Sequence, residues 1–161
     1  MSGTVHTYRT TLAWTGSTGA GYDAYDRTHT VTAPPAEAAL TLASDPAFKG
    51  DPALLSPEQL VVLAASSCQL LSFLAVAARA RIDVVSYEDT AEATMPEDDR
   101  PVRITRIVLR PAITVGASGG GDGPTEERLH HLAEVAHRDC YVANSLRTEV
   151  VVDPTFTRRQ A

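Results

Sequence analysis

The fold is decided by residues 56–81, which read SPEQLVVLAASSCQLLSFLAVAARAR. The beginning is typical of a helix N-terminus, because Ser56 can cap the helix, Pro57 suits the first helical position and Gln59 can complete a capping box. No charged residue follows from position 60 to position 78, and two arginines stand in the last turn. We predict a helix of about 24 residues, roughly 36 Å long. Because it is apolar on all sides, we expect it to be buried as the central helix of the core.

The same apolar run has a length close to that which a bilayer requires, so a membrane span must be weighed. Its centre, Ser66-Ser67-Cys68-Gln69, argues against a span, because polar groups are costly in lipid unless they are paired. The N-terminus does not show basic residues followed by an apolar segment, the pattern of a signal peptide. We therefore expect a cytoplasmic protein that does not cross a membrane.

The length and charge of the chain restrict its class further. At 161 residues, the chain is expected to form a single domain over residues 1–161. The formal net charge is −6 at pH 7, and the Lys and Arg residues are scattered. This balance argues against nucleic acid or an anionic lipid surface as the main partner.

Strand-like stretches, rich in Thr, Tyr, Val and Ile, lie on both sides of the long helix. Before the helix they are residues 4–14, 22–33 and 38–43, the first two joined by a glycine-rich turn that predicts a hairpin. After the helix they are residues 84–95, 103–115 and 147–154. A second helix is expected to begin after Thr125 and a short one to cover residues 139–146, while residues 116–123 read as a flexible glycine-rich loop. This order predicts an α+β protein whose sheets wrap a buried helical layer.

Cys68 and Cys140 are the residues most suited to chemistry. Two cysteines in a cytoplasmic protein stay reduced at rest, so the residues alone leave a redox pair and two unrelated buried thiols as alternatives. Two serines and a glutamine flank Cys68, and donors of this kind help to stabilise a reactive thiolate. His137 stands three residues before Cys140, which would place an imidazole near the second sulfur if the helix continues. Neither zinc-ligand spacing nor a G-x-S-x-G motif occurs, so no metal site and no serine hydrolase is predicted.

Two motifs and one loop carry a resemblance to a known family. The first motif is Ser56-Pro57-Glu58-Gln59-Leu60, with Cys68 ten residues after Glu58 and Leu-Leu-Ser-Phe-Leu shortly behind it. The second motif is AHRDCYVANSL over residues 136–146, and the loop FKGDP covers residues 48–52. Together they resemble the OsmC/Ohr family, the osmotically inducible and organic hydroperoxide resistance proteins, over nearly the whole chain.

This resemblance implies an OsmC-like fold, with two antiparallel sheets wrapped around two central helices in an intertwined homodimer. It also implies a thiol peroxidase of the oxidative stress response that reduces organic hydroperoxides. Cys68 would attack the peroxide and Cys140 would resolve the sulfenic acid as a disulfide. No cofactor is implied, since an external thiol or dithiol would restore both cysteines. The alternative is a non-catalytic OsmC-like dimer that binds a ligand or senses redox state.

The resemblance further implies that Glu58 pairs with an arginine beside the thiolate. Arg27 is our candidate for this role, and Lys49 is the alternative, although a lysine holds a carboxylate and a thiolate together less well than the guanidinium fork. Gln69 departs from the histidine that related chains often carry after the cysteine. Because Glu58 and Cys68 lie about 15 Å apart along one helix, we expect the partner subunit to supply one of them.

Overall fold

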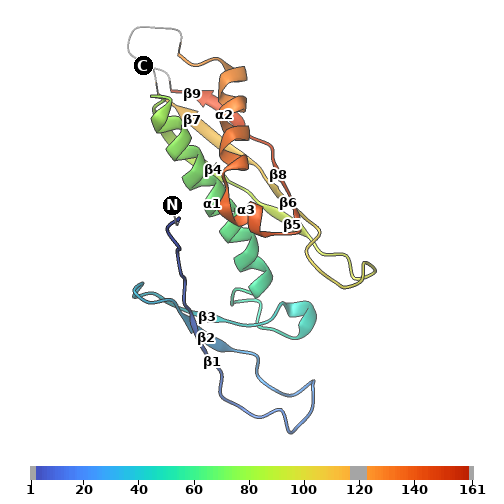
Figure 1. Cartoon of the computed structure of the whole chain (residues 1–161). Coiled ribbons are helices and arrows are strands. Elements are labelled where there is room, and N and C mark those ends of the chain that lie inside the picture. The colour runs from blue at the N-terminus through green and yellow to red at the C-terminus, as the bar shows by residue number, and fades with distance from the viewer. Residues whose placement is uncertain (1–2, 117–122, 160–161) are drawn as a thin grey trace. The chain divides into compact units, whose positions relative to one another are not determined.

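The computed structural model describes residues 3–116 and 123–159 of the chain. It divides into two compact units, Met1–Leu60 and Val61–Ala161, which are described separately (Figure 1). A single domain over the whole chain therefore stays a prediction. Most of the glycine-rich loop predicted over residues 116–123 lies outside the described residues.

The N-terminal unit contains a three-stranded antiparallel sheet in the order β1 (Thr11–Ala13), β2 (His29–Thr32), β3 (Ala39–Leu42). The predicted hairpin is confirmed, although the paired strands are shorter than the predicted stretches. A short 3₁₀ helix, η1 (Pro46–Phe48), follows and leads to Gly50. A Cβ at this position would lie 1.5 Å from the carbonyl oxygen of Ser44, so only glycine fits this turn.

Helix α1 (Pro57–Arg79) is the predicted long helix, and the capping box at its start is confirmed. The backbone N–H of Gln59 donates to Ser56 Oγ at 3.3 Å, and the backbone N–H of Ser56 donates to Gln59 Oε1 at 2.9 Å. The expectation of burial on all sides is wrong for the single chain. Leu63 and Leu71 are 51% and 63% exposed, because the buried positions of α1 recur at helical spacing along one face only.

Two further three-stranded sheets lie in the C-terminal unit. One contains β4 (Val84–Asp89), β7 (Pro111–Val115) and β9 (Thr155–Arg158); the other contains β5 (Glu92–Thr94), β6 (Arg106–Leu109) and β8 (Glu149–Val152). The predicted strands over 84–95 and 103–115 are thus each divided in two. The predicted closing strand corresponds to β8, and β9 was not predicted.

The strand directions correct the expectation of two antiparallel sheets. Strands β4 and β7, and likewise β5 and β6, pair antiparallel, but β7–β9 and β6–β8 pair parallel. The parallel pairing follows from the connection between β7 and β8, which contains the helices α2 (Glu126–Arg138) and α3 (Tyr141–Ser145). A parallel pair requires a crossover of this kind, usually helical, whereas a hairpin yields an antiparallel pair.

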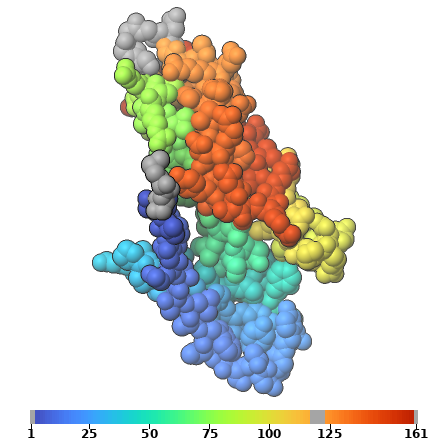
Figure 2. Space-filling view, viewed as in Figure 1, coloured from blue at the N-terminus to red at the C-terminus, as the bar shows by residue number. Residues whose placement is uncertain are grey.

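The main core of the C-terminal unit lies between α1, α2 and β7 (Figure 1). Residues Pro111, Ile113 and Val115 are buried while Ala112 is exposed, so β7 turns one face to the helices. Figure 2 shows α2, in orange, packed beside the green C-terminal part of α1. The helix residues buried in this cluster are Phe73, Val76, Ala77, Leu129, Ala133 and Ala136.

The start of α2 is also as predicted. Oγ1 of Thr125 accepts a hydrogen bond from the backbone N–H of Arg128 at 3.2 Å. The helix ends at Arg138, and Cys140 directly precedes α3. By length and composition alone α1 could cross a membrane, with a mean hydropathy of 2.1. The core helix of a globular protein meets the same criterion, so this observation supports a span only weakly.

Candidate active site

The structure brings the two cysteines together within the C-terminal unit. Cys68 lies on α1 and Cys140 at the N-terminal end of α3, and the thiol of Cys140 donates a hydrogen bond to the sulfur of Cys68. Cys140 is 1% exposed, Cys68 is half-buried, and both are free thiols. Residues far apart in the sequence therefore form a reduced pair that is positioned to exchange a proton.

The surroundings of Cys68 favour its thiolate. Partial burial by itself raises the pKa of the Cys68 thiol, but hydrogen bonds to the sulfur outweigh this effect and hold the pKa below its ordinary value of 9.0. The donors are the backbone N–H of Val142, the thiol of Cys140, the backbone N–H of Tyr141 and the hydroxyl of Ser72. Because the thiolate is the nucleophilic form, Cys68 is the more reactive of the two cysteines.

Cys140 has the opposite character. Burial, followed by the neighbouring Cys68, raises the pKa of its thiol to about 11, because a thiolate at Cys68 retains the shared proton. The backbone N–H groups of Ala143 and Val142 oppose this effect only in part. Cys140 is therefore a protonated donor at neutral pH. This difference in pKa distinguishes Cys68, the sulfur suited to nucleophilic attack, from Cys140, which stays protonated.

A cavity of about 620 Å³ opens beside Cys68. One side of it is a stripe of α1 residues at helical spacing, mostly apolar between Cys68 and Arg79. The opposite side is polar and comes from the end of α2 and from α3. The residues of this second side are Arg138, Asp139, Tyr141 and Asn144. A cavity of this size and mixed lining fits a small organic molecule in reach of the sulfur.

A polar cluster fixes α1 to β4 at Ser66, two residues before Cys68. The hydroxyl of Ser66 donates to Oδ2 of Asp89, whose Oδ1 accepts from the backbone N–H of Arg110 at 2.7 Å. The hydroxyl of Tyr87 is buried and has no hydrogen-bond partner within the described residues. Burial, followed by the charges of Asp89 and Cys140, raises the pKa of Tyr87 above its ordinary value. This cluster holds the central part of α1, and with it Cys68, against the sheet.

Glu58 lies in the first turn of α1. Its Oε2 atom is buried, yet no hydrogen-bond donor reaches it from the described parts of the chain. A buried carboxylate oxygen without a donor is costly, so a cationic or donor group from outside the described chain would stabilise it. The predicted role of Glu58 at the thiolate stays a prediction.

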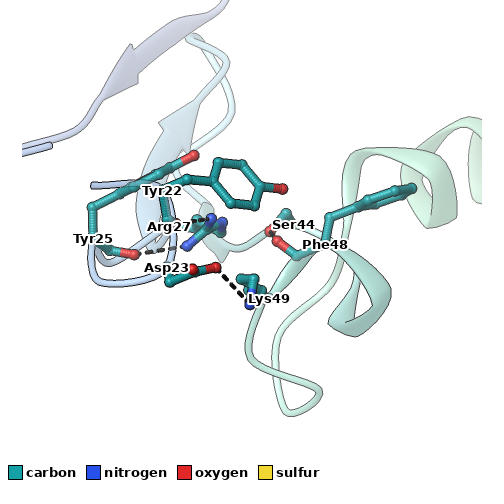
Figure 3. Close-up of polar contacts among 7 residues, drawn as sticks. All are labelled: Tyr22, Asp23, Tyr25, Arg27, Ser44, Phe48 and Lys49. Carbon is teal, nitrogen blue, oxygen red and sulfur yellow. Dashed lines mark hydrogen bonds and ion pairs between the residues drawn. The ribbon is translucent and has the colours of Figure 1, made fainter.

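Arg27 is held within the N-terminal unit (Figure 3). Its guanidinium donates to the carbonyl oxygens of Tyr25 and Tyr22 at 2.8 and 2.7 Å and lies 3.9 Å from the centre of the Tyr25 ring. Lys49, the alternative, forms an ion pair with Asp23 at 2.8 Å. In the described part of the chain, two of the five N–H donors of the Arg27 guanidinium are thus engaged, which leaves three that could bind a carboxylate. Within residues 3–116 and 123–159, Lys49 forms an ion pair and Arg27 forms none, but the place of Arg27 in the site stays a prediction.

Two further side chains that the sequence singled out face elsewhere. Gln69 is 1% exposed and donates to the carbonyl oxygen of Ala133 on α2 at 3.4 Å, so it packs the helices together and does not line the cavity. His137 lines a second cavity of about 280 Å³ beside β8. Because α2 ends at Arg138, the helical spacing that was to bring His137 to the sulfur of Cys140 does not continue.

Sequence reasoning missed four contributors to the site. The backbone N–H groups of Tyr141 and Val142 carry no side-chain signal, so only the coordinates identify them as donors. Arg79 was assigned only to the end of the long helix, and Arg138 was named only as part of the motif over residues 136–146. The spacing of eleven residues between Cys68 and Arg79, which places these two residues on one face of a helix, is a signal that could have identified Arg79. In the described part of the chain, no group of three His, Cys, Asp or Glu side chains has a metal-binding arrangement. The prediction that no metal is needed stays untested.

These features define a class: a small α+β protein with a hydrogen-bonded dithiol between a long apolar helix and a short one, beside a ligand-sized cavity. The chain belongs to the OsmC-like protein family, which matches residues 50–155. No curated protein sequence matches the chain.

Solved structures agree with this assignment. An OsmC-like protein of unknown function from Vibrio cholerae has a TM-score of 0.82 and 28% identity, covering 94% of this chain and 100% of that one. An organic hydroperoxide resistance protein OsmC from Legionella pneumophila has a TM-score of 0.69 and 18% identity, covering 96% and 99%. The OhrB organic hydroperoxide resistance protein of Bacillus subtilis has a TM-score of 0.60 and 17% identity, covering 94% and 98%. The predicted OsmC-like α+β fold is therefore confirmed.

Proposed function

We propose that this protein is a cytoplasmic, thiol-dependent peroxidase that reduces organic hydroperoxides as a homodimer. The observation that carries the proposal is the hydrogen-bonded pair of cysteines, in which the pKa of Cys68 is lowered and that of Cys140 is raised. A peroxidase needs two thiols with different pKa values, because one sulfur must be a thiolate at neutral pH and the other must stay available for the second step. Membership of a family with organic hydroperoxide resistance proteins adds to this support.

The reaction proceeds in balanced steps. The Cys68 thiolate attacks the terminal peroxide oxygen, the O–O bond breaks, and the leaving alkoxide takes a proton to become the alcohol. Cys68 is left as a sulfenic acid. The thiol of Cys140 then attacks this sulfur, which forms the Cys68–Cys140 disulfide and releases water. An external dithiol reduces the disulfide by exchange and is itself oxidised, so the protein requires no bound cofactor.

The oxidation of Cys68 also prepares Cys140 for its role. In the reduced protein, the thiolate of Cys68 raises the pKa of Cys140. Conversion to a neutral sulfenic acid removes this charge, so the Cys140 proton is lost more easily at the moment when a nucleophile is needed. The cavity beside Cys68 supports organic over small polar peroxides, because apolar side chains of α1 form one of its sides.

In the proposed dimer, the partner subunit supplies Glu58 beside Cys68. The two residues are ten positions apart on α1, about 15 Å along the helix axis, so they do not meet within one chain. The unsatisfied oxygen of Glu58 supports this arrangement, since a buried carboxylate calls for a donor. Arg27 would hold Glu58 and orient it toward the thiolate.

Steady-state kinetics with dithiothreitol as the reductant test the proposal. The wild-type protein should reduce cumene hydroperoxide with a kcat/KM at least about tenfold above that for hydrogen peroxide, as the apolar cavity wall predicts. The Cys68→Ser variant should be inactive. Cys140→Ser, treated with the peroxide in the absence of dithiothreitol, should accumulate the sulfenic acid because the resolving thiol is missing. A wild-type protein that consumes neither peroxide would overturn the proposal and favour the non-catalytic ligand-binding alternative.

A further inference from the structure

Two arginines share the cavity with the reactive sulfur. Arg79 stands in the last turn of α1 and Arg138 in the last turn of α2, and both residues line the cavity that opens at Cys68. Cations at helix C-termini are common because they offset the helix dipole, and this explains why each arginine is tolerated. It does not explain why two separate helices direct their terminal arginines to the same cavity.

Neither guanidinium is neutralised within the described residues. The ion pairs recorded for residues 3–116 and 123–159 involve other basic side chains, and neither arginine takes part in one. One carboxylate, that of Asp139, also lines the cavity but is not ion-paired with either arginine. The cavity wall therefore carries more positive than negative side-chain charge.

The α1 residues that line the cavity run from the reactive sulfur at one end to a guanidinium group at the other. Cys68, Ser72, Ala75 and Arg79 follow one another at helical spacing, so they lie on one face. Arg79 is eleven residues beyond Cys68, about 16 Å along the axis, with Leu71 and Ala75 between them. Arg138 belongs to the opposite side and is close in sequence to Cys140. A ligand would thus meet a sulfur, an apolar wall and guanidinium groups in one space.

We propose that Arg79 and Arg138 are specificity-determining residues that select peroxides bearing a carboxylate. This inference rests on the proposed function, since it names the substrate class of the same site. The guanidinium fork matches a carboxylate in two parallel hydrogen bonds, and the apolar wall of α1 receives the hydrocarbon body of the substrate. The two arginines also offset the repulsion between an anionic substrate and the Cys68 thiolate.

A matched pair of substrates tests the proposal. Cumene hydroperoxide and its para-carboxylated analogue differ by one carboxylate, and the measured quantity is the ratio of their kcat/KM values. The wild-type protein should favour the carboxylated peroxide by about tenfold, the effect of a hydrogen-bonded charge pair. The advantage should appear as a lower KM for the carboxylated peroxide with a similar kcat, because the carboxylate is remote from the bond that breaks. It should decline at high salt, as expected for an ion pair in a solvent-accessible cavity.

Variants of the two arginines complete the test. The double variant Arg79→Gln with Arg138→Gln should lose the advantage, and the corresponding double lysine variant should retain part of it because the charge stays. Arg103→Gln, which changes a partly exposed arginine paired with Asp99 at 3.5 Å, is the matched control and should keep the ratio. Equal preference in the wild-type protein, or an advantage that survives the double glutamine variant, would overturn the proposal.

A binding measurement separates this inference from the peroxidase activity. Calorimetry of the reduced protein with 4-isopropylbenzoate and with the neutral 4-isopropylbenzamide requires no turnover. Preferential binding of the benzoate that depends on both arginines supports the anion site even if no peroxide is reduced. In that case the peroxidase proposal fails and the site is that of a carboxylate-binding protein. Equal binding of the two compounds contradicts the inference even if the peroxidase is active.

Discussion

At the scale of single residues, the chemistry depends on a difference between two thiols in contact. Backbone and side-chain donors lower the pKa of Cys68, while burial and the neighbouring sulfur raise that of Cys140 to about 11. The reactive thiolate therefore rests on hydrogen-bond donors that lie close to the Cys68 sulfur. It needs the short helix α3, whose first N–H groups lie at the sulfur of Cys68.

Alkylation as a function of pH measures this difference directly. Because the pKa of Cys68 is lowered, its thiolate persists below pH 9.0 and the rate of alkylation should fall only as the pH drops through the lowered pKa. Cys140→Ala removes one donor and should raise the pKa of Cys68, whereas Cys140→Ser keeps a hydroxyl donor and should shift it less. Mass spectrometry identifies the labelled residue. An unchanged profile in Cys140→Ala would show that the second thiol does not act on the first.

At the scale of elements, the long helix depends on its N-terminal capping box. Ser56→Ala removes the acceptor of the Gln59 N–H and should lower the free energy of unfolding by about 1 kcal/mol. Ser56→Thr keeps the hydroxyl and is the matched control. Urea denaturation at a fixed protein concentration measures both, since oligomers unfold in a concentration-dependent manner. Equal stability of the two variants would argue against the cap.

The elements also show what the sequence can and cannot predict. Capping signals and hydropathy patterns predicted α1 and α2, because such signals depend only on residues close together in the sequence. Thr125 and Ser56 cap these helices as expected. The parallel pairing of β6 with β8 depends on where the crossover returns the chain, which local patterns do not encode. The same limit applies to the site. The sulfur atoms were predictable, but the N–H groups of Tyr141 and Val142 that activate Cys68 were not.

At the scale of the whole molecule, the single chain leaves apolar surface uncovered on α1. Leu63 is 51% exposed and lies midway between Glu58 and Cys68 in the sequence. If Glu58 of each subunit serves Cys68 of the other, two antiparallel copies of α1 should cross near Leu63. Leu63→Glu should then dissociate the dimer and abolish peroxidase activity, while Leu63→Ala keeps the face apolar and should remain dimeric. Analytical ultracentrifugation measures the state, and a dimeric, active Leu63→Glu variant would refute the crossing.

Complementation tests whether the site combines residues from two chains. Mixed dimers of Cys68→Ser and Glu58→Gln subunits contain one site with both residues intact, so subunit exchange between two inactive proteins should restore activity. If exchange is complete, half of the dimers are mixed and the expected activity is about a quarter of the wild-type value. Mixtures that stay inactive after exchange, verified by native mass spectrometry, would place Glu58 outside the partner's site.

The most direct test of the peroxidase account is mass spectrometry of the reduced protein after one equivalent of cumene hydroperoxide. We expect the loss of two hydrogen atoms from the protein and a peptide that joins Cys68 to Cys140, and neither change in Cys68→Ser. Two untouched thiols in the wild-type protein would contradict the account.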